Sequence, residues 1–523
     1  MAIMRRPAAC LGSSLSLALA LALTLSLLTG CADLPPQDGR VASSALLDTA
    51  GTALGQAMAP LLAAHPGKSG VYALADGRDA FAARAVLANS AQSSLDVQSY
   101  IWHGDITGTL LFGALRAAAD RGVRVRLLLD DNGTEGLDDT LALLDAHANF
   151  EVRLYNPFVR RGARILGFLT DFSRLNRRMH NKSFTVDGQA TIVGGRNIGD
   201  EYFGAAGDLL FSDLDVLAIG PAVKAVSDDF DRYWNSASAY PVSSLVAAPD
   251  SASIAAVTRK LAAIEQTSAA RAYRVTMRDS GFVAQMVGRS LPFEWATARL
   301  VSDNPAKTLR QAPDSSRLMP QLRDLVGAPA HSLDLVSSYF VPGEAGTAAL
   351  SMLAKSGVAV RVLTNSLAAT DVPAVHAGYA KSRKSLLAAG VKLYELRATW
   401  QADDRRRGGF VGSSSSSLHT KTFAVDNEHV FIGSFNFDPR SARLNTEMGF
   451  VIDSPLMARQ LDARMSGGVA ERAYEVRLGS DGELEWIERK EGVELRYRSE
   501  PGAGLWRRLQ VRVLSGLPID WLL

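Results

Sequence analysis

The chain has 523 residues, which exceeds one ordinary domain and suffices for two domains with full hydrophobic cores. Its net charge is only +2 and its charged content 21%, which exclude a strong global field drawing it onto nucleic acid or an acidic membrane. The two cysteines, Cys10 and Cys31, both lie near the N-terminus, which excludes a disulfide framework and a cysteine-based metal site.

Residues 1–30 have the features of a secretory signal peptide. A basic start at Arg5 and Arg6 precedes an uncharged Leu/Ala-rich run over 15–28, and Leu-Thr-Gly-Cys occupies positions 28–31. That ending resembles the bacterial lipoprotein box, so Cys31 is the predicted lipidation site. The alternative is a membrane-spanning anchor, although the run is shorter than the roughly 20 residues that a span needs. Both interpretations predict a cell-envelope protein on the periplasmic side of the inner or outer membrane.

Residues 31–70 are rich in Ala, Pro, Gly and Ser and are predicted to form a tether. The chain then repeats once, with strand-like segments in the same order in both halves: 94–102 with 332–340, 121–128 with 356–363, and 151–155 with 390–394. Asp96 and Asp334 are 238 positions apart, and His180 and His419 are 239 apart, so the halves keep register.

Strands alternating with helical segments are typical of an α/β protein. We therefore predict two α/β lobes related by a pseudo-twofold axis, each a mixed sheet flanked by helices, over residues 71–246 and 301–470. Few strand signals occur over 247–300, which predicts a helical connection. Residues 471–523 form a C-terminal extension whose Trp- and Arg-containing tail, 505–523, either anchors at a membrane interface or covers the core.

Two further segments stand out by composition. Residues 159–178 hold six arginines against one acid, Asp171, with apolar residues between them. This predicts either an element that docks on anionic lipid or a solvated basic helix. The Gly/Ser tract over 403–417 predicts a loop that could act as a lid.

Each half carries one copy of the same motif, a histidine followed by a lysine two positions on and an aspartate five further: His180, Lys182 and Asp187 in the first half, and His419, Lys421 and Asp426 in the second. On a strand, residues i and i+2 point to the same face. Each half thus offers one imidazole and one ammonium group on a shared surface. Facing halves would gather both pairs around one point between the lobes, which is the predicted active site.

A Gly-x-x-Asn turn follows each motif and supplies an amide, from Asn197 or Asn436, while Ser434 adds a hydroxyl in the second half. Lysines and amides can hold the non-bridging oxygens of a phosphodiester and stabilise a five-coordinate transition state. One neutral histidine can attack phosphorus while the other protonates the leaving alkoxide. Because the lysines supply the positive charge, we predict no metal and no cofactor.

A nucleophilic histidine needs an acceptor on its other ring nitrogen. Glu447, on the strand after the second motif, and Asp213, after the first, are the predicted orienting carboxylates, with Asp215 as an alternative to Asp213. Asp187 and Asp426 lie too far along the chain for that duty and more plausibly fix the turn of each motif. His103 and Arg440 are candidates for headgroup or phosphate contacts, or for packing and pairing.

The two motifs, each followed by Gly-x-x-Asn, resemble the signature of the phospholipase D superfamily, although Gly195 stands where that family often has serine. Nearly the whole mature chain is similar to bacterial cardiolipin synthases. The resemblance implies a phosphohistidine on His180, with His419 as general acid. It also implies transfer of a phosphatidyl group from phosphatidylethanolamine or phosphatidylglycerol to the hydroxyl of phosphatidylglycerol.

The same residues would serve a phospholipase D-type hydrolase that releases phosphatidic acid, so that alternative stays open. A periplasmic nuclease is disfavoured by the near-neutral charge and by the lack of an aromatic and basic stripe. An inactive scaffold is disfavoured by two complete motifs. The expected partners are phospholipids and a membrane surface, without nucleic acid.

Overall fold

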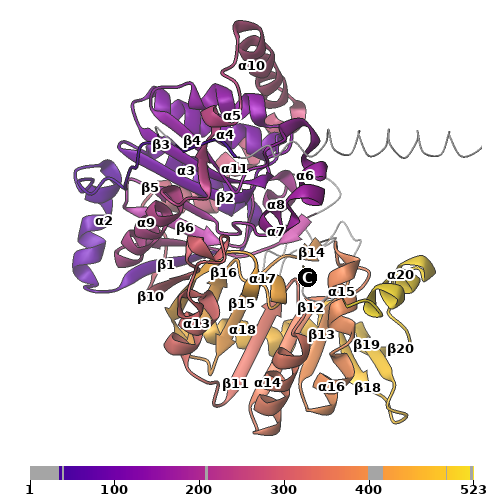
Figure 1. Ribbon diagram of the computed structural model, residues 1–523. Helices are drawn as coiled ribbons and strands as arrows, with labels where there is room; N and C mark the ends of the chain where they lie inside the picture. The colour runs from indigo at the N-terminus through magenta and orange to yellow at the C-terminus, as the bar shows by residue number, and fades with distance from the viewer. Residues whose placement is uncertain (1–33, 38–39, 206–209, 399–415, 491, 519–521) are drawn as a thin grey trace, which may run out of the picture.

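The computed structural model describes residues 34–37, 40–205, 210–398, 416–490, 492–518 and 522–523 (Figure 1). The predicted signal peptide, the predicted lipidation site Cys31 and all but the end of the predicted lid, 403–417, lie outside the described residues. Within the described ranges, every helix is too short or too polar to cross a bilayer.

The first lobe is built on one mixed sheet, in which three central strands are parallel and their neighbours antiparallel. In spatial order its strands are β9 (Ala239–Pro241), β4 (Phe150–Tyr155), β3 (Arg124–Gly133), β2 (Ser94–Ile101), β5 (Ser183–Val186), β6 (Ala190–Gly194), β8 (Asp215–Ile219) and β1 (Ser69–Leu74).

The second lobe repeats this order strand for strand, again with three parallel strands in the middle. Its strands are β18 (Ala473–Leu478), β13 (Lys392–Leu396), β12 (Ala359–Asn365), β11 (Ser332–Ser337), β15 (Lys421–Val425), β16 (His429–Gly433), β17 (Met448–Asp453) and β10 (Glu294–Ser302). Two more strands, β19 (Leu484–Lys490) and β20 (Val493–Tyr497), extend the sheet beyond β18. The predicted pair of pseudo-twofold-related α/β lobes is therefore confirmed.

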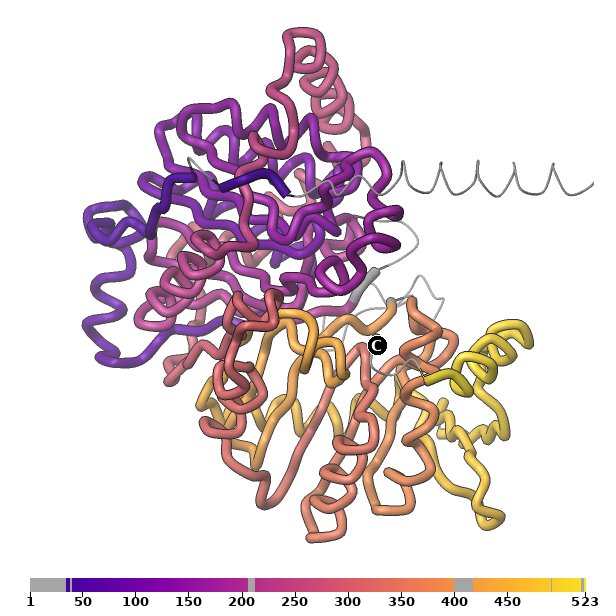
Figure 2. The backbone as a smooth tube through the Cα atoms, in the orientation of Figure 1, coloured from indigo at the N-terminus to yellow at the C-terminus, as the bar shows by residue number. Residues whose placement is uncertain are grey.

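The two sheets meet through β10. Glu294–Ala296 pair with β1 of the first lobe, and Thr297–Ser302 pair with β17 of the second. A smaller parallel pair also crosses between the lobes, β7 (Leu210–Ser212) with β14 (Ser416–Leu418). Figure 2 shows the chain of each lobe as a separate layered body, with the boundary running across the middle of the molecule.

Helices cover the sheets in both lobes (Figure 1). Those of the N-terminal segment and first lobe are α2 (Ala53–Ala64), α3 (Gly77–Ser90), α4 (Ile106–Asp120), α5 (Asp138–Asp145), α6 (Arg164–Thr170), α7 (Phe172–Leu175), α8 (Asp200–Phe203) and α9 (Pro221–Trp234). Those of the second lobe and C-terminal segment are α13 (Leu318–Val326), α14 (Gly343–Lys355), α15 (Pro373–Ala380), α16 (Arg383–Ala388), α17 (Pro439–Arg443), α18 (Pro455–Ala463), α19 (Val469–Arg472) and α20 (Leu505–Ser515).

Local sequence accounts for the central strands and the helices beside them. The apolar run Leu127–Leu129 in β3 is fully buried, as expected for a parallel strand covered on both faces. Asp105 caps α4 by accepting from the backbone N–H of Gly108, and Asp76 caps α3 in the same way from Arg78. The buried faces of both helices then join the strands in one apolar core.

The segment boundaries differ from the predicted ones at two places. The helical connection consists of α10 (Ser251–Glu265), α11 (Ser268–Arg278) and α12 (Gly281–Val287), but the rest of 247–300 includes β10, because the second sheet needs that edge strand. The predicted extension from 471 contributes β18 to the second sheet for the same reason.

The predicted tether also differs from expectation, because its described part from residue 40 lies against the first lobe. The guanidinium group of Arg40 donates to the carbonyls of Asn235 and Ala239. Buried Arg126 donates to the carbonyl of Ser43, and α2 follows from Ala53. Hydrogen bonds from arginine side chains thus hold this segment against the lobe.

Candidate active site

The motif histidines lie at the lobe boundary, where each motif is bonded to the chain of the other lobe. The backbone N–H of His180 donates to the carbonyl of Thr446 (2.9 Å), and that of His419 donates to the carbonyl of Ser212 (2.7 Å). The residue before each histidine also pairs with the opposite lobe. Met179 forms a β-bridge with Thr446. Leu418 pairs with Ser212 where β14 lies beside β7. Backbone pairing therefore brings the two motifs to one place.

Each imidazole is held by a carboxylate from the opposite lobe. His180 Nδ1 lies 2.8 Å from Glu447 Oε2, and His419 Nδ1 lies 2.5 Å from Asp213 Oδ2. Both carboxylates are fully buried, and both imidazoles nearly so. In both rings Nδ1 is therefore the nitrogen that faces the carboxylate. Both carboxylates were predicted from the sequence, but the crossing of each pair between the lobes was not.

The electrostatics of the site favour a neutral nucleophile. Burial lowers the pKa of His180 to about 4, with Glu447 opposing the shift and Lys182 adding to it. Burial and Lys421 likewise lower the pKa of His419, against the opposing effect of Asp213. A neutral imidazole carries the lone pair that attack on phosphorus requires.

Both lysines are buried beside the histidines. Lys182 Nζ donates to the carbonyl of His180 (2.7 Å), and Lys421 Nζ donates to that of His419. Burial, helped by the charge of Lys421, lowers the pKa of Lys182 to about 7. Burial likewise lowers the pKa of Lys421 to about 8. The charge of each lysine also acts on the histidine of the other lobe, as expected for one shared site.

Ser434 does not have the role that the sequence predicted. Its hydroxyl donates to Glu447 Oε2 and accepts from the backbone N–H of Met448 (3.0 Å). It therefore positions the carboxylate that holds His180, and the predicted phosphate contact is corrected. The first lobe has Gly195 at this place, where a Cβ would lie 2.2 Å from Asp213 Oδ1. The missing serine is thus explained by the close approach of Asp213.

The two asparagines lie beside the site, each with a local partner. Asn197 Nδ2 donates to the hydroxyl of Tyr202 (2.9 Å), and Asn436 Oδ1 accepts from Ser338 Oγ (2.9 Å). Contact of either amide with phosphate stays a prediction.

The motif aspartates are structural and do not touch the reacting groups. Asp187 accepts from the backbone N–H groups of Gln92, Ser93 and Ser94 at 2.7–3.3 Å. Asp426 accepts in the same way from three consecutive residues, 330–332. Each aspartate ties the turn after its motif to the start of the neighbouring strand. Their inclusion among the catalytic residues is therefore corrected, while the predicted turn-fixing role agrees with the structure.

Comparison with known proteins shows the family and the fold to which these lobes belong. The family described as "Cardiolipin synthase, PLD-like domain" matches residues 86–234 and 322–467, one stretch in each lobe. The chain belongs to the cardiolipin synthase family of PLD-like proteins. Both motifs of this family member lie within the matched stretches.

Two relatives show how far the similarity extends. Cardiolipin synthase C of Escherichia coli (strain K12) is 51% identical over 471 residues, which cover 90% of this chain and 99% of the relative. Cardiolipin synthase A of Pseudomonas syringae pv. syringae (strain B728a) is 29% identical over 381 residues, covering 72% and 64%. The crystal structure of phosphatidylserine synthase from Haemophilus influenzae Rd KW20 shares the fold, with a TM-score of 0.50, 14% identity and coverage of 77% and 87%.

Several residues that shape the site of this cardiolipin synthase family member were not predicted from the sequence. The rings of Tyr100 and Tyr202 lie edge-on to His180 and His419, with centroids 5.0 and 5.2 Å apart. Tyr100 stands in a segment already recognised as repeated, and that repetition could have marked it. Tyr202 has no such signal, because it comes from the short helix α8.

A second pair of missed residues holds the chain just before each histidine. Asp130, which follows the apolar run Leu127–Leu129 in β3, accepts from the backbone N–H of Met179 (2.7 Å). Asn365, at the end of β12, accepts from that of Leu418 (2.9 Å). The two positions correspond in the repeat, and the signal was a polar residue soon after the apolar part of a strand in each half.

The remaining candidates have other partners. Asp215 pairs with Arg84 (2.8 Å), so Asp213 is the orienting residue in its lobe. His103, Asp105 and Glu201 lie close enough to share a cation. However, Asp105 already accepts from the backbone N–H groups of Gly108 and Asp200. Glu201, in turn, pairs with His103 (3.2 Å). We therefore assign no metal there. Arg440 donates to the carbonyl of Leu522 and to Asn176 Oδ1, which makes its contacts internal.

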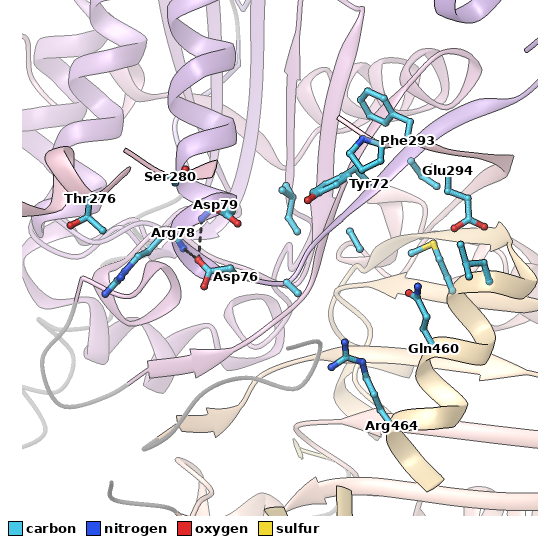
Figure 3. Close-up of a pocket in the computed structure, with 17 residues that line it drawn as sticks. Tyr72, Asp76, Arg78, Asp79, Thr276, Ser280, Phe293, Glu294, Gln460 and Arg464 are labelled. Carbon is cyan, nitrogen blue, oxygen red and sulfur yellow. Dashed lines mark hydrogen bonds between the residues drawn. The ribbon is translucent and has the colours of Figure 1, made fainter. Parts of the chain in front are cut away.

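A large open pocket lies away from the histidines. It measures about 860 Å³ and lies between the start of α3 and α18, with Asp79, Glu294 and Arg464 among its lining residues (Figure 3). Neither motif contributes to its wall. We locate the active site by the paired imidazoles and lysines, because pocket size carries no chemistry of its own.

Proposed function

We propose that this protein is a phosphatidyltransferase that forms cardiolipin by transferring a phosphatidyl group to phosphatidylglycerol. One observation carries the proposal: two buried imidazoles from different lobes, each held by a buried carboxylate of the other lobe, beside two buried lysines. The 51% identity with an Escherichia coli cardiolipin synthase supports the choice of substrate class.

The first step moves the phosphatidyl group onto the protein. His180 Nε2 attacks the phosphorus of the donor phospholipid, and an N–P bond forms while the P–O bond to the headgroup breaks. Protonated His419 gives its Nε2 proton to the departing headgroup oxygen. Lys182 and Lys421 stabilise the charge on the non-bridging oxygens. The anionic substrate favours the protonated form of His419, which offsets the lowering of its pKa by burial.

The second step regenerates the protein. The free hydroxyl of phosphatidylglycerol gives its proton to His419 Nε2 while its oxygen attacks phosphorus and the N–P bond to His180 breaks. Cardiolipin leaves, and both histidines return to their starting states. Water in place of that hydroxyl would give phosphatidic acid, so the acceptor decides between transfer and hydrolysis.

Lipid analysis of a reaction in vesicles tests the proposal. Purified protein is incubated with phosphatidylglycerol vesicles, with and without phosphatidylethanolamine, and the lipids are followed by mass spectrometry. We expect cardiolipin, together with the free headgroup of the donor. His180→Ala and His419→Ala should each abolish turnover. Phosphatidic acid as the sole product would replace the transferase with a hydrolase.

We further propose that the protein is a lipoprotein of the bacterial cell envelope, anchored through Cys31. The proposal rests on the basic start, the apolar run and the Leu-Thr-Gly-Cys ending of residues 1–31. Cells fed labelled palmitate should label the protein, and Cys31→Ser should remove the label and release the protein from the membrane fraction. Retention of the Cys31→Ser variant in membranes without label would favour a spanning anchor instead.

A further inference from the structure

We propose that one face of the protein docks on the lipid bilayer by inserting apolar side chains from two segments on either side of the lobe boundary. This inference rests on the proposed function, because it names the surface through which lipid substrates would reach the site. We define the docking surface by the exposed apolar residues of α6, α7, α20 and the turn after α20: Ile165, Leu166, Leu169, Phe172, Leu505, Trp506, Leu509, Val513 and Leu517.

The first segment is apolar on its outer side. Ile165 and Leu169, one helical turn apart on α6, are 79% and 82% exposed. Phe168, by contrast, packs its ring against Phe158 and attaches the helix to the first lobe. Exposed apolar residues elsewhere in the described chain are mostly single, whereas these stand together, and such patches mark interaction sites.

Four of the six arginines of this segment are paired with carboxylates of the protein. Arg161 pairs with Asp131 and Asp138, and Arg164 donates to Asp138 (3.0 Å) and to the carbonyl of Asp131 (2.7 Å). Arg174 and Arg178 pair with Asp171 and Asp130 in the same way. The sequence predicted either docking on anionic lipid or a solvated basic helix, and these pairs leave the four arginines with less charge to offer a lipid surface than either alternative assumed. What the segment presents to the outside is apolar.

The second segment has two apolar sides, and only one of them is covered. Val511 of α20 is buried in a small core with Leu367, Ala377 and Ala503, which fixes the helix on the second lobe. The opposite side carries Trp506, which is 83% exposed and aligned with Leu509 and Val513. Tryptophan and leucine on an exposed helical stripe suit the boundary between headgroups and acyl chains.

The two segments are linked beside the lobe boundary. Leu522 and Leu523, which come after α20 in the sequence, accept through their carbonyls from the side chain and the backbone N–H of Arg440. Arg440 also donates to Asn176, the residue that follows α7. In Figure 1, α6 and α20 both lie on the right-hand side, above and below the lobe boundary.

The same link leads to the catalytic groups. Asn176 lies four positions before His180, and Arg178 between them is bonded to Asp130 and Asn445. A bilayer touching both segments would therefore face the boundary at which the two histidines meet. We commit to a lipid bilayer as the occupant because the proposed donor and acceptor are both membrane lipids. Because the side chains proposed to insert are apolar, insertion is expected to persist at high salt.

Quenching of Trp506 fluorescence tests the insertion directly, and it does not depend on catalysis. The full chain is reconstituted in phosphatidylcholine vesicles whose acyl chains carry bromine, and tryptophan emission is compared between the wild type and Trp506→Phe. We expect bromine to quench the Trp506 component both without added salt and at about 0.5 M salt, which screens surface charge. No quenching of that component would overturn the docking surface. Loss of quenching at high salt would also overturn the proposal, because it would show that charge attraction, and not insertion of apolar side chains, holds the protein on the vesicle.

Turnover gives the second readout. Ile165→Glu/Leu169→Glu and Trp506→Glu/Val513→Glu should each slow turnover of vesicle phosphatidylglycerol by about tenfold or more, because charges replace inserted side chains. Turnover of a dispersed short-chain phosphatidylglycerol should stay within about twofold, since the changed residues are exposed and away from the motifs. Met352→Glu, on α14 and 68% exposed, is the matched control and should leave both rates unchanged.

Three further results would separate bilayer docking from its competitors. Equal loss of turnover on vesicle and dispersed lipid would mean that the variants damage the fold, and would overturn the proposal. If light scattering shows that the wild type is a dimer and the glutamate variants are monomers, and brominated lipid does not quench Trp506, the surface would be assigned to a second copy of the chain. If no cardiolipin forms but Trp506 is still quenched, the proposed function fails while the docking surface stands.

Discussion

At the scale of single residues, the site depends on carboxylates that reach across the lobe boundary. Glu447 is hydrogen-bonded to His180 and to Ser434, and it lies near the charge of Lys182. Although burial raises the pKa of Glu447, these contacts lower it overall, and the carboxylate stays ionised. An ionised acceptor on Nδ1 fixes the tautomer in which Nε2 is free to attack.

Replacing either orienting carboxylate by its amide tests this role. Glu447→Gln and Asp213→Asn should each lower kcat by about 10²–10⁴-fold with little change in KM, because the amide can favour the wrong tautomer while keeping the shape. Asp453→Asn is the matched control, since Asp453 accepts from His429 at the surface (2.9 Å). That variant should keep full activity. Normal kcat in both buried amide variants would contradict the crosswise assignment.

The pH dependence of kcat/KM follows from the lysines. Because Lys182 and Lys421 have pKa values of about 7 and about 8, both lose their protons as the pH rises through that range. Neutral lysines cannot hold the phosphate oxygens, and His419, whose pKa in the free protein is lowered by burial and by Lys421, must be protonated to act as general acid. The value of kcat/KM should therefore fall as the pH rises, and it should be low above about pH 7–8. On the acid side it should hold until His180 is protonated near its pKa of about 4. A profile that rises through pH 7–9, or an acid limb near pH 6.5, would contradict these shifts.

The reacting residues could be predicted from sequence because identical spacing occurs twice. The roles of Ser434 and Gly195 could not, because they depend on how close Glu447 and Asp213 approach from the neighbouring strand. The crosswise pairing has no signal in either half alone, since it arises only when the halves face each other.

At the scale of elements, each motif leads from its histidine into a short strand, β5 or β15, whose end is tied by an aspartate. Asp187 and Asp426 have φ values of 51° and 54°, in the left-handed region that aspartate tolerates better than most residues. Each also accepts three backbone N–H groups at the start of the neighbouring strand. The turn and the strand start are therefore held as one unit.

Removing that tie should destabilise the lobe. Asp187→Ala should lower the free energy of unfolding by about 2–4 kcal/mol, because charged hydrogen bonds to three backbone N–H groups are lost and alanine is strained at positive φ. Asp187→Asn keeps an acceptor and tolerates the turn, so it should lose clearly less. Urea denaturation measures both. Equal loss for alanine and asparagine, or less than about 1 kcal/mol for alanine, would contradict the role.

Most elements could be predicted from the repeat, but β10 and β18 could not be assigned to the second sheet. Each is an edge or near-edge strand that comes from outside the matched segments, and its partners are far away in the chain. The segment around Arg40 was expected to be a tether because its composition is loop-like. Its hydrogen bonds to the first lobe come from single side chains and leave no periodic pattern.

At the scale of the whole molecule, the lobes form one body because strands cross the boundary. β10 pairs with β1 on one side and with β17 on the other, and β7 pairs with β14. The covalent connection through α10, α11 and α12 is therefore one of several links. Residues 288–290, just after α12, are exposed.

A cut in that exposed stretch tests the strength of the boundary. A protease site inserted after Gly288 should allow complete cleavage, and the two fragments should still elute together and keep most of the activity. The expectation follows because the crossing strands and the bonds from His180 to Thr446 and from His419 to Ser212 remain. The uncut insertion variant is the control. Fragments that separate without denaturant would show that the connection holds the lobes together.

The central claim is that both histidines act on one phosphorus atom. A crystal structure with tungstate or vanadate bound tests it most directly. We predict one oxyanion between the rings, with the Nε2 atoms of His180 and His419 on opposite sides within about 3.5 Å of it and both lysines on its oxygens. An oxyanion held by one lobe alone, with the second imidazole turned away, would contradict the claim.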